Sequence, residues 1–422
     1  MEYKRKDLGY YNLHMIKTDK FKTITFKIVF REEVLKNKIT IRNLLVDNLI
    51  FSSLKYPSKK ILVRKTQDLY GASLFGLNKR LGNHMITEFT LSILNPKYTE
   101  KGMMSESLDF FHEIIFNPNV KNGKFDSEIF DINYRNIKND INSLKEDPDA
   151  LTQALLKEAM DKNSPFSYRV MGYMKDLKLI DEKSLYEYYK HMLSTNVIDF
   201  YVVGDINFKE IEKIVKDTFN FITTKNITTE LAIRYENPRN KEQVIVKDTN
   251  FNQSKLAIGC SLEELSLKEK KYILPIYNII LGSSPKSKFF TNIREKNSLC
   301  YTINSSFRRI DNLLYIGAGI SFKNNKKTVS LIKKEMNDMK KGLFNKSDID
   351  SAKELYISMI KDIEEYPNSI CDYYFGLDYL GIDSIEKQLV KIKEVSKEEI
   401  LEVAKKVKID TIYTLREGVN NG

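Results

Sequence analysis

The chain has 422 residues, of which 42% are hydrophobic and 30% are charged, as in ordinary globular proteins. At about 150 residues per domain this length predicts two or three domains, and the composition excludes disorder throughout. The longest uncharged run, Tyr272–Pro285, is too short to span a bilayer, so we expect no membrane partner. The first residues, MEYKRKDLGYY, are basic without a following apolar stretch, which disfavours a secretory signal and favours a cytoplasmic protein.

Lys and Arg total 68 against 57 Asp and Glu, a formal charge of +11 that is spread along the whole chain. Such an excess is typical of a solvated surface, and no basic arm or RNP-like strand supports nucleic acid as a partner. Cys260, Cys300 and Cys371 are odd in number and far apart, which predicts reduced thiols and disfavours a disulfide framework.

The first half of the chain predicts a strand, a helix, a second strand, three helices and a closing strand. In chain order these are Thr23–Arg31, Ile39–Ser53, Met85–Leu94, Lys101–Ile115, Asp126–Leu144, Glu182–Met192 and Ile198–Val203.

The second half predicts the same order of elements. They are Lys255–Leu262, Lys268–Ser284, Leu313–Phe322, Lys326–Lys341, Lys346–Glu365, Lys397–Val407 and Thr411–Leu415. Pro148 and Pro367 follow the long helix of each half, as prolines often follow helix ends. Ser396 with Glu399 three residues later forms the pattern of a capping box.

The repeated order predicts an α+β fold of two homologous halves, each an antiparallel-rich sheet with helices packed on it. Strands and helices do not alternate strictly, which disfavours a parallel doubly wound sheet. We expect the halves at residues 1–220 and 244–422, because residues 221–243 are polar and turn-rich, as a linker should be.

No motif for metal, cofactor or nucleophilic chemistry is present. A zinc protease helix needs two histidines on one face with a glutamate beside them, and the sequence has neither H-E-x-x-H nor H-x-x-E-H. Gly317-Ala318-Gly319 lies in a predicted strand, where close approach of neighbouring atoms explains the glycines. We therefore assign no catalytic residue, metal or cofactor. Histidines at four positions are interpreted as surface or packing residues: His14, His84, His112 and His191.

The segment from Gly282 to Tyr301 is the strongest candidate for binding. Gly282, Ser283 and Ser284 are small, and their backbone N–H groups can serve a ligand or a passing peptide. Arg294 and Tyr301 lie seven residues apart across a predicted helix end, where a guanidinium and a phenol can hold a peptide carbonyl. Composition alone favours the alternative, an arginine that caps a helix and a tyrosine in a strand.

This segment resembles the second half of the insulinase/pitrilysin peptidases, which read approximately G-S-x-S-x-L-F-x-x-I-R-E-x-x-G-L-A-Y. The resemblance covers nearly the whole chain and implies two α+β halves that close as a clamshell around a chamber. The phrase Asp68–Ala72 fits a zinc-less bacterial subgroup of the family. The matching residues are Gly282, Ser283, Ser287, Phe290, Ile293-Arg294-Glu295, Leu299 and Tyr301, with Gly204-Asp205, Asp147-Pro148, Pro165-Phe166 and Gly172 elsewhere.

The departure from the family lies at its zinc site. Active members carry H-x-x-E-H on the first long helix, and alignment places Leu44, Asp47 and Asn48 on those positions. The third ligand, a glutamate, corresponds to Asp140. Leucine offers zinc no lone pair and asparagine is a weak ligand, whereas catalytic zinc needs three protein ligands and a placed base. We therefore predict that the chain holds no metal and is not an enzyme on its own.

Arg294 and Tyr301, by contrast, match the family's substrate-clamping pair, so the resemblance favours a binding role for them. It implies a non-catalytic, peptide-binding subunit of a two-chain zinc metallopeptidase, similar in role to the inactive subunit of mitochondrial processing peptidase. The expected partner is a zinc-bearing H-x-x-E-H subunit in a heterodimer. An extended peptide would add a strand to an edge strand near Leu81–Ile86.

The alternative is a scaffold that cuts nothing. Zinc-less relatives of this kind are described as associated with the 5-aminopentanol modification of elongation factor P. A third hypothesis, that the protein binds nucleic acid, is supported by the positive charge alone.

Overall fold

The computed structural model describes residues 1–220 and 238–418, and the chain forms two compact units. The first unit comprises Met1–Asn142, Arg169–Leu231 and Glu364–Gly376, and the second comprises Ser143–Tyr168, Ala232–Ile363 and Leu377–Gly422. Most of the expected linker, 221–237 of 221–243, lies outside the described residues.

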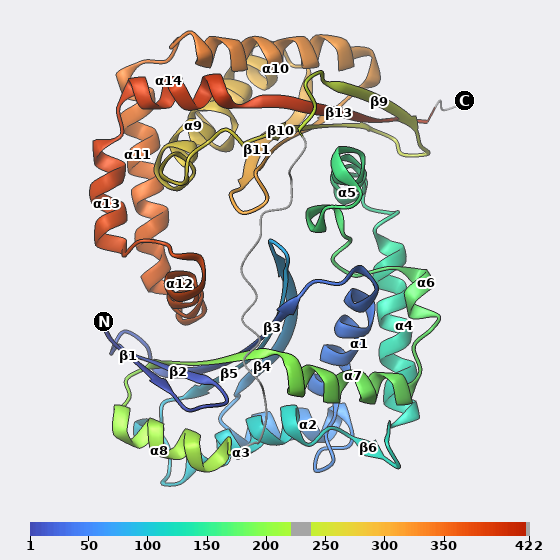
Figure 1. The fold of residues 1–422 in the computed structure, drawn as a ribbon, viewed down its shortest axis with the longest axis vertical. Helices are drawn as coiled ribbons and strands as arrows, with labels where there is room; N and C mark the ends of the chain where they lie inside the picture. The colour runs from blue at the N-terminus through green and yellow to red at the C-terminus, as the bar shows by residue number, and fades with distance from the viewer. Residues whose placement is uncertain (221–237, 419–422) are drawn as a thin grey trace. The chain divides into compact units, whose positions relative to one another are not determined.

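The first unit is built on a six-stranded sheet in the order β1-β2-β8-β3-β5-β4 (Figure 1). The pair β2–β8 is parallel and the other neighbours are antiparallel. The edge strands are therefore β1 and β4. The strands are β1 (Glu2–Asp7), β2 (Asn12–Lys17), β3 (Thr23–Glu33), β4 (Ser73–Leu81), β5 (His84–Leu94) and β8 (Val197–Gly204), with a small hairpin of β6 (Val120–Lys121) and β7 (Lys124–Phe125).

Alternation along β3 gives this sheet an apolar face and a charged face. Ile24, Phe26 and Ile28 belong to the hydrophobic core of the unit, whereas Lys27 on the opposite face contacts Glu88 and Asp372. Helices of the unit contribute to that core. The helices are α1 (Ile39–Phe51), α2 (Lys59–Asp68), α3 (Met103–Phe116), α4 (Ser127–Ser143), α6 (Met174–Leu177), α7 (Glu182–Thr195) and α8 (Phe208–Thr218).

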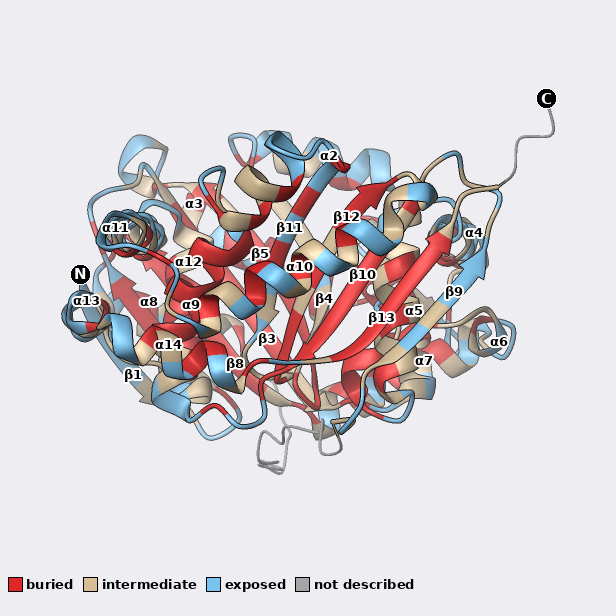
Figure 2. Ribbon diagram, turned by 90° about the horizontal axis from the view of Figure 1, so that it is seen from above, coloured by how far each residue is buried: buried red, intermediate tan, exposed pale blue. Residues whose placement is uncertain are grey.

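The second unit is built on a five-stranded sheet in the order β11-β12-β10-β13-β9, in which only β13 and β9 are parallel. Figure 2 shows β10 and β13 largely buried and the edge strand β9 largely exposed. The strands are β9 (Gln243–Asp248), β10 (Ser254–Ser261), β11 (Cys300–Arg308), β12 (Leu313–Ile320) and β13 (Lys408–Arg416).

The predicted helix Lys268–Ser284 belongs to the second unit. It is π-helical at Glu269–Ile273 and Ile279–Ser283, on either side of a short α9 (Leu274–Asn278). The other helices of this unit are α5 (Pro148–Asp161), α10 (Asn325–Lys340), α11 (Lys346–Lys361), α12 (Pro367–Leu380), α13 (Ile385–Glu394) and α14 (Lys397–Lys406), and α12 crosses from the first unit to the second after Gly376.

Each unit contains a helix from the other half of the chain. Helix α5 packs on β10 of the second sheet, where a Cβ on Gly259 would lie 2.2 Å from the Met160 sulfur, so glycine permits this close packing. The first part of α12 lies on the charged face of the first sheet, where Asp372 is 3.0 Å from the Lys27 Nζ. The compact units therefore differ from the two halves of the chain by two exchanged helices.

The predicted α+β class, with two antiparallel-rich sheets and helices packed on them, is confirmed, and each element predicted above is present within a few residues. The capping box at Ser396 is present, since its side chain and that of Glu399 bind each other's backbone N–H groups. The Tyr315 ring and the Gln253 side chain cover Gly317 and Gly319, as close approach predicts. Within the described residues, no helix has the length and apolar composition that a membrane span requires.

Candidate functional site

Arg294 and Tyr301 meet at a turn between a helical segment and β11. The helical turn Phe290–Glu295 places the Arg294 guanidinium 4.5 Å from the centre of the Phe290 ring. Ser298 then adopts a left-handed conformation with φ 49°, which reverses the chain into the strand. As a result the Arg294 Nε donates a hydrogen bond of 3.0 Å to the Tyr301 carbonyl oxygen. The predicted pair is adjacent, but the backbone of Tyr301 makes the contact.

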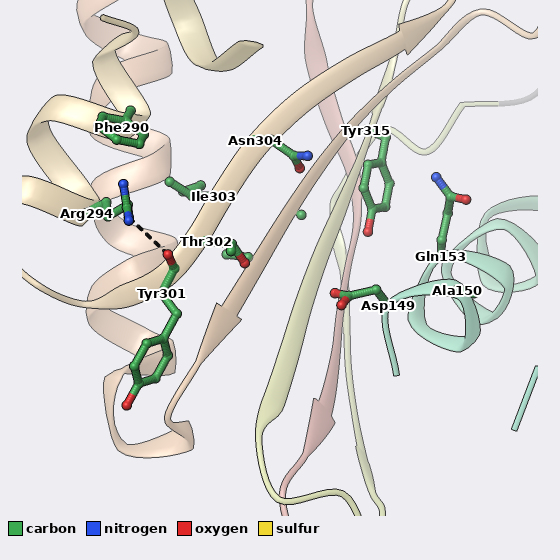
Figure 3. Close-up of a pocket in the computed structure, with 12 residues that line it drawn as sticks. Asp149, Ala150, Gln153, Phe290, Arg294, Tyr301, Thr302, Ile303, Asn304 and Tyr315 are labelled. Atoms are coloured by element: carbon green, nitrogen blue, oxygen red, sulfur yellow. Dashed lines mark hydrogen bonds between the residues drawn. The ribbon is translucent and has the colours of Figure 1, made fainter. Parts of the chain in front are cut away.

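The Tyr301 phenol points away from the guanidinium, as Figure 3 shows. Its side chain is 74% exposed, and Arg294 is exposed as well. Stacking and the Nε bond fix the guanidinium, while its two Nη groups have no hydrogen-bond partner among the described residues. They remain available to a carbonyl or carboxylate oxygen, the acceptors that arginine binds best.

The pair opens into a cavity of about 640 Å³ that lies wholly within the second unit (Figure 3). Helix α5 forms one wall, and its side chains Asp149 and Gln153 were not identified from sequence. The only local signal is Asp147 before Pro148, a helix start whose aspartate accepts from two backbone N–H groups. The cavity is lined by Asp149, Ala150, Gln153, Phe290, Arg294, Tyr301, Thr302, Ile303, Asn304, Tyr315, Gly317 and Ala318.

Gly282, Ser283 and Ser284 do not line this cavity. A Cβ on Gly282 would lie 2.5 Å from both the Phe289 ring and the Ser305 Oγ, so this buried glycine is required for packing. The Ser284 Oγ donates to the Ile279 carbonyl at 3.2 Å and lines a separate cavity beside α11. Ligand binding by these three residues stays a prediction, and the structure gives Gly282 a packing role instead of an open backbone.

The four positions that match the family's zinc site separate into two pairs. Leu44 is fully buried in the core, and Asn48 is 1% exposed with its Nδ2 donating to the Leu44 carbonyl at 2.8 Å. Asp47 and Asp140 instead line a polar cavity of about 450 Å³ with Lys59. In the described parts of the chain, no group of three His, Cys, Asp or Glu side chains could hold a metal ion.

The Asp47 carboxyl is unfavourably placed for a charge. Burial and the nearby Asp140 raise its pKa from 3.8 to about 6, and the Lys59 ammonium only partly opposes them. Burial also lowers the pKa of Lys59, while Asp47 acts in the opposite direction. The Lys59 Nζ donates to the Ile50 carbonyl at 3.2 Å. A lysine on α2 therefore supplies the cation beside the two carboxyls of this cavity.

The open edge of the first sheet is β4, which pairs only with β5. The expected peptide position, Leu81–Ile86, spans the last residue of β4, the turn at Gly82 and the start of β5. Because β5 is hydrogen-bonded on both sides, it cannot accept a further strand. Of the expected position, only Leu81 belongs to the edge strand β4, Ser73–Leu81, and peptide binding at this edge stays a prediction.

Two α+β units and an arginine–tyrosine corner in the second are features that the resemblance to zinc-less insulinase-like proteins implies. Residues 180–356 match the family described as Peptidase M16 inactive domain, M16 being the insulinase/pitrilysin peptidases. Over 97% of its length, the chain is 27% identical to the protein named Probable inactive metalloprotease YmfF of Bacillus subtilis, 96% of which it covers.

Solved structures share the fold. A crystal structure of a conserved protein from Enterococcus faecalis has a TM-score of 0.93 and 26% identity, with 100% of both chains covered. A peptidase M16 inactive domain from Pseudomonas fluorescens has the same fold, with a TM-score of 0.80, 13% identity and 99% of each chain covered. The resemblance stated from sequence is confirmed: residues 180–356 match an inactive peptidase domain, and nearly the whole chain is similar to a probable inactive metalloprotease.

Proposed function

We propose that this protein is the peptide-binding, non-catalytic subunit of a two-chain zinc metallopeptidase in the cytoplasm. The observation that carries the proposal is the contrast between its two candidate sites. Leu44 and Asn48, which the resemblance aligns with metal ligands, are buried, while Arg294 lines an open cavity and its Nη groups have no partner among the described residues.

The residues of this chain would bind and orient the peptide. The edge of β4 offers backbone N–H and C=O groups to an extended peptide, which supplies affinity without demanding a particular sequence. Arg294 would bind a peptide carbonyl through Nη. Because stacking on Phe290 and the bond to Tyr301 already fix its guanidinium, little side-chain freedom is lost on binding.

The zinc, its bound water and the base would come from an H-x-x-E-H partner, in a heterodimer that closes around the peptide. Zinc lowers the pKa of its bound water and polarises the scissile carbonyl. This chain would position the substrate. Alignment of the reacting atoms can raise the reaction rate by several orders of magnitude.

The test is peptide cleavage by an equimolar mixture of this protein and the H-x-x-E-H relative from the same genome, with each protein alone as reference. Only the mixture should cleave. Arg294→Ala should slow cleavage by the mixture at least about tenfold. The matched control is Lys296→Ala, on the same exposed turn but outside the cavity.

Unchanged cleavage with Arg294→Ala contradicts the binding role of the arginine. If no combination cleaves a broad peptide library, the two-chain peptidase is refuted, and a scaffold associated with elongation factor P modification becomes the function to test.

A further inference from the structure

The cavity beside Arg294 contains hydrogen-bonding groups that the protein itself leaves unused. Four neutral polar side chains line it: Gln153 on α5, Thr302 and Asn304 on β11, and Tyr315 on β12. In the part of the chain that the structure describes, none of the four side chains has a hydrogen-bond partner. In Figure 3, Thr302 and Asn304 lie along β11 near Arg294, and Tyr315 and Gln153 lie farther from it.

The backbone explains why these groups stand around an open space. Thr302 and Asn304 pair with Gly319 and Gly317 across the β11–β12 ladder, so their direct partners on the neighbouring strand carry no side chain. The Tyr315 ring lies over Gly317, with its hydroxyl 2.9 Å from the place a Cβ would take. The cavity therefore has a floor of backbone and small residues with amides and hydroxyls at its sides.

The two charged groups of the cavity are already engaged. The Asp149 carboxylate lies 2.8 Å from the Lys255 ammonium. Arg294 is held at the opposite end, where a peptide carbonyl would occupy its Nη groups. Between these ends only neutral groups remain, and burial raises the pKa of the Tyr315 phenol, which keeps it a donor.

We propose that this cavity selects a peptide whose residue beside the Arg294-bound carbonyl carries a carboxamide side chain, that of glutamine or asparagine. A carboxamide both donates and accepts, and the Gln153 and Asn304 amides with the Tyr315 and Thr302 hydroxyls complement both functions. The inference rests on the proposed peptide-binding function and adds its substrate class.

Other side chains fit the cavity less well. An apolar side chain would displace water from four polar groups and leave them without hydrogen bonds. Leaving polar groups of a site unpaired is the strongest way in which a binding site discriminates against a ligand. A carboxylate or ammonium would meet an opposite charge only at the ends of the cavity, where Arg294 would hold the peptide carbonyl and Asp149 is paired with Lys255. Gln153, Asn304 and Tyr315 are therefore specificity-determining residues, contributed by both halves of the chain.

The experiment measures binding of fluorescein-labelled extended peptides to the full-length chain by fluorescence anisotropy. One glutamine is moved along a Gly/Ser peptide, and at the best position it is replaced by methionine, glutamate or asparagine. Methionine matches glutamine in length without its amide, and glutamate matches its shape with a charge. We expect the glutamine peptide to bind at least about tenfold more tightly than the methionine and glutamate peptides.

Variants of the protein locate the preference. Asn304→Leu and Gln153→Leu should reduce the ratio between glutamine and methionine peptides to within about threefold, with little change for the methionine peptide. Ser306→Ala, on the same exposed side of β11 but outside the cavity, should keep the full ratio.

Peptide binding without preference for a carboxamide, or a preference that survives both leucine variants, overturns this inference and leaves the proposed function standing. Absence of binding for every peptide overturns both.

Discussion

At the scale of single residues, the four positions that the resemblance aligns with the family's zinc site have two different surroundings. Leu44 and Asn48 now complete the packing of α1, whereas Asp47 keeps a carboxyl in a polar cavity beside Asp140 and Lys59. The resemblance assigns all four positions, because a motif is matched residue by residue. It does not show that two of them turn into the core and two line a cavity, since that depends on how α1 and α4 pack.

The raised pKa of Asp47 makes a prediction for Asp47→Asn. A carboxyl whose folded pKa is raised favours the protonated form, so its penalty is absent below about pH 4, grows up to about pH 6 and is constant above. Asp47→Asn should therefore raise the thermal midpoint at pH 7.5 more than at pH 4.5. The gain should reach about 1–3 kcal/mol, since each pKa unit corresponds to about 1.4 kcal/mol.

The control for Asp47→Asn is Asp131→Asn, an exposed carboxyl on α4. It should shift the midpoint equally little at both pH values. An Asp47→Asn effect that does not depend on pH would contradict the buried, unfavourable charge.

Gly282 allows its packing role to be separated from a binding role. Gly282→Ala would force a Cβ against Phe289 and Ser305, so we expect a loss of about 1–3 kcal/mol in the free energy of unfolding, measured with urea. Ser283→Ala, at the exposed neighbouring position, should leave stability unchanged. Equal stability of the two variants would show that the loop moves aside and that glycine is not required there.

At the scale of elements, the charged face of the first sheet is organised around Lys27. Its ammonium is 3% exposed, 3.5 Å from Glu88 on β5 and 3.0 Å from Asp372 on α12. Lys79 on the edge strand β4 contacts the same two carboxylates. These ion pairs hold α12 on the sheet next to the strand edge proposed for the peptide.

The two carboxylates, Glu88 and Asp372, should contribute differently to the free energy of unfolding. Glu88→Gln removes a buried partner, 4% exposed, and we expect it to cost about 3–5 kcal/mol in the free energy of unfolding. Asp372→Asn removes one that is 49% exposed and should cost about 1 kcal/mol or less. Urea titrations of both variants test this order, and an equal loss would mean that Asp372 is as deeply buried as Glu88 in solution.

Local patterns predict elements better than they predict partners. The apolar runs of β3, β5 and β10 can be predicted as strands from sequence, because β-branched and aromatic residues follow one another there. Strand β4 carries Asn78, Lys79 and Arg80 and is recognised only through its pairing with β5. The wall of the Arg294 cavity on α5 is likewise beyond local patterns, since which sheet a helix covers is decided by distant residues.

For the whole molecule, the exchanged helices α5 and α12 predict how the chain behaves when it is divided. A fragment of residues 1–220 lacks α12, and a fragment of 244–422 lacks α5, which packs through Leu156 and Met160 in the second unit. Produced together, the fragments should co-purify at a one-to-one ratio, whereas each alone should expose apolar surface and aggregate.

Leu156→Asp in the first fragment should abolish co-purification, because it places a charge in the core that α5 completes. Half-buried Glu158→Ala on the same helix is the matched comparison. Fragments that are each monomeric and stable alone would contradict the exchange.

Both exchanged helices begin with a proline, Pro148 and Pro367, and each follows the long helix of its own half. The two halves of the chain thus exchange the helix that occupies the same place in the repeated order of elements. A single ancestral half would have been incomplete alone and whole only as a domain-swapped pair of identical chains. Joined in one polypeptide, the two copies can diverge in sequence while each still receives its missing helix from the other.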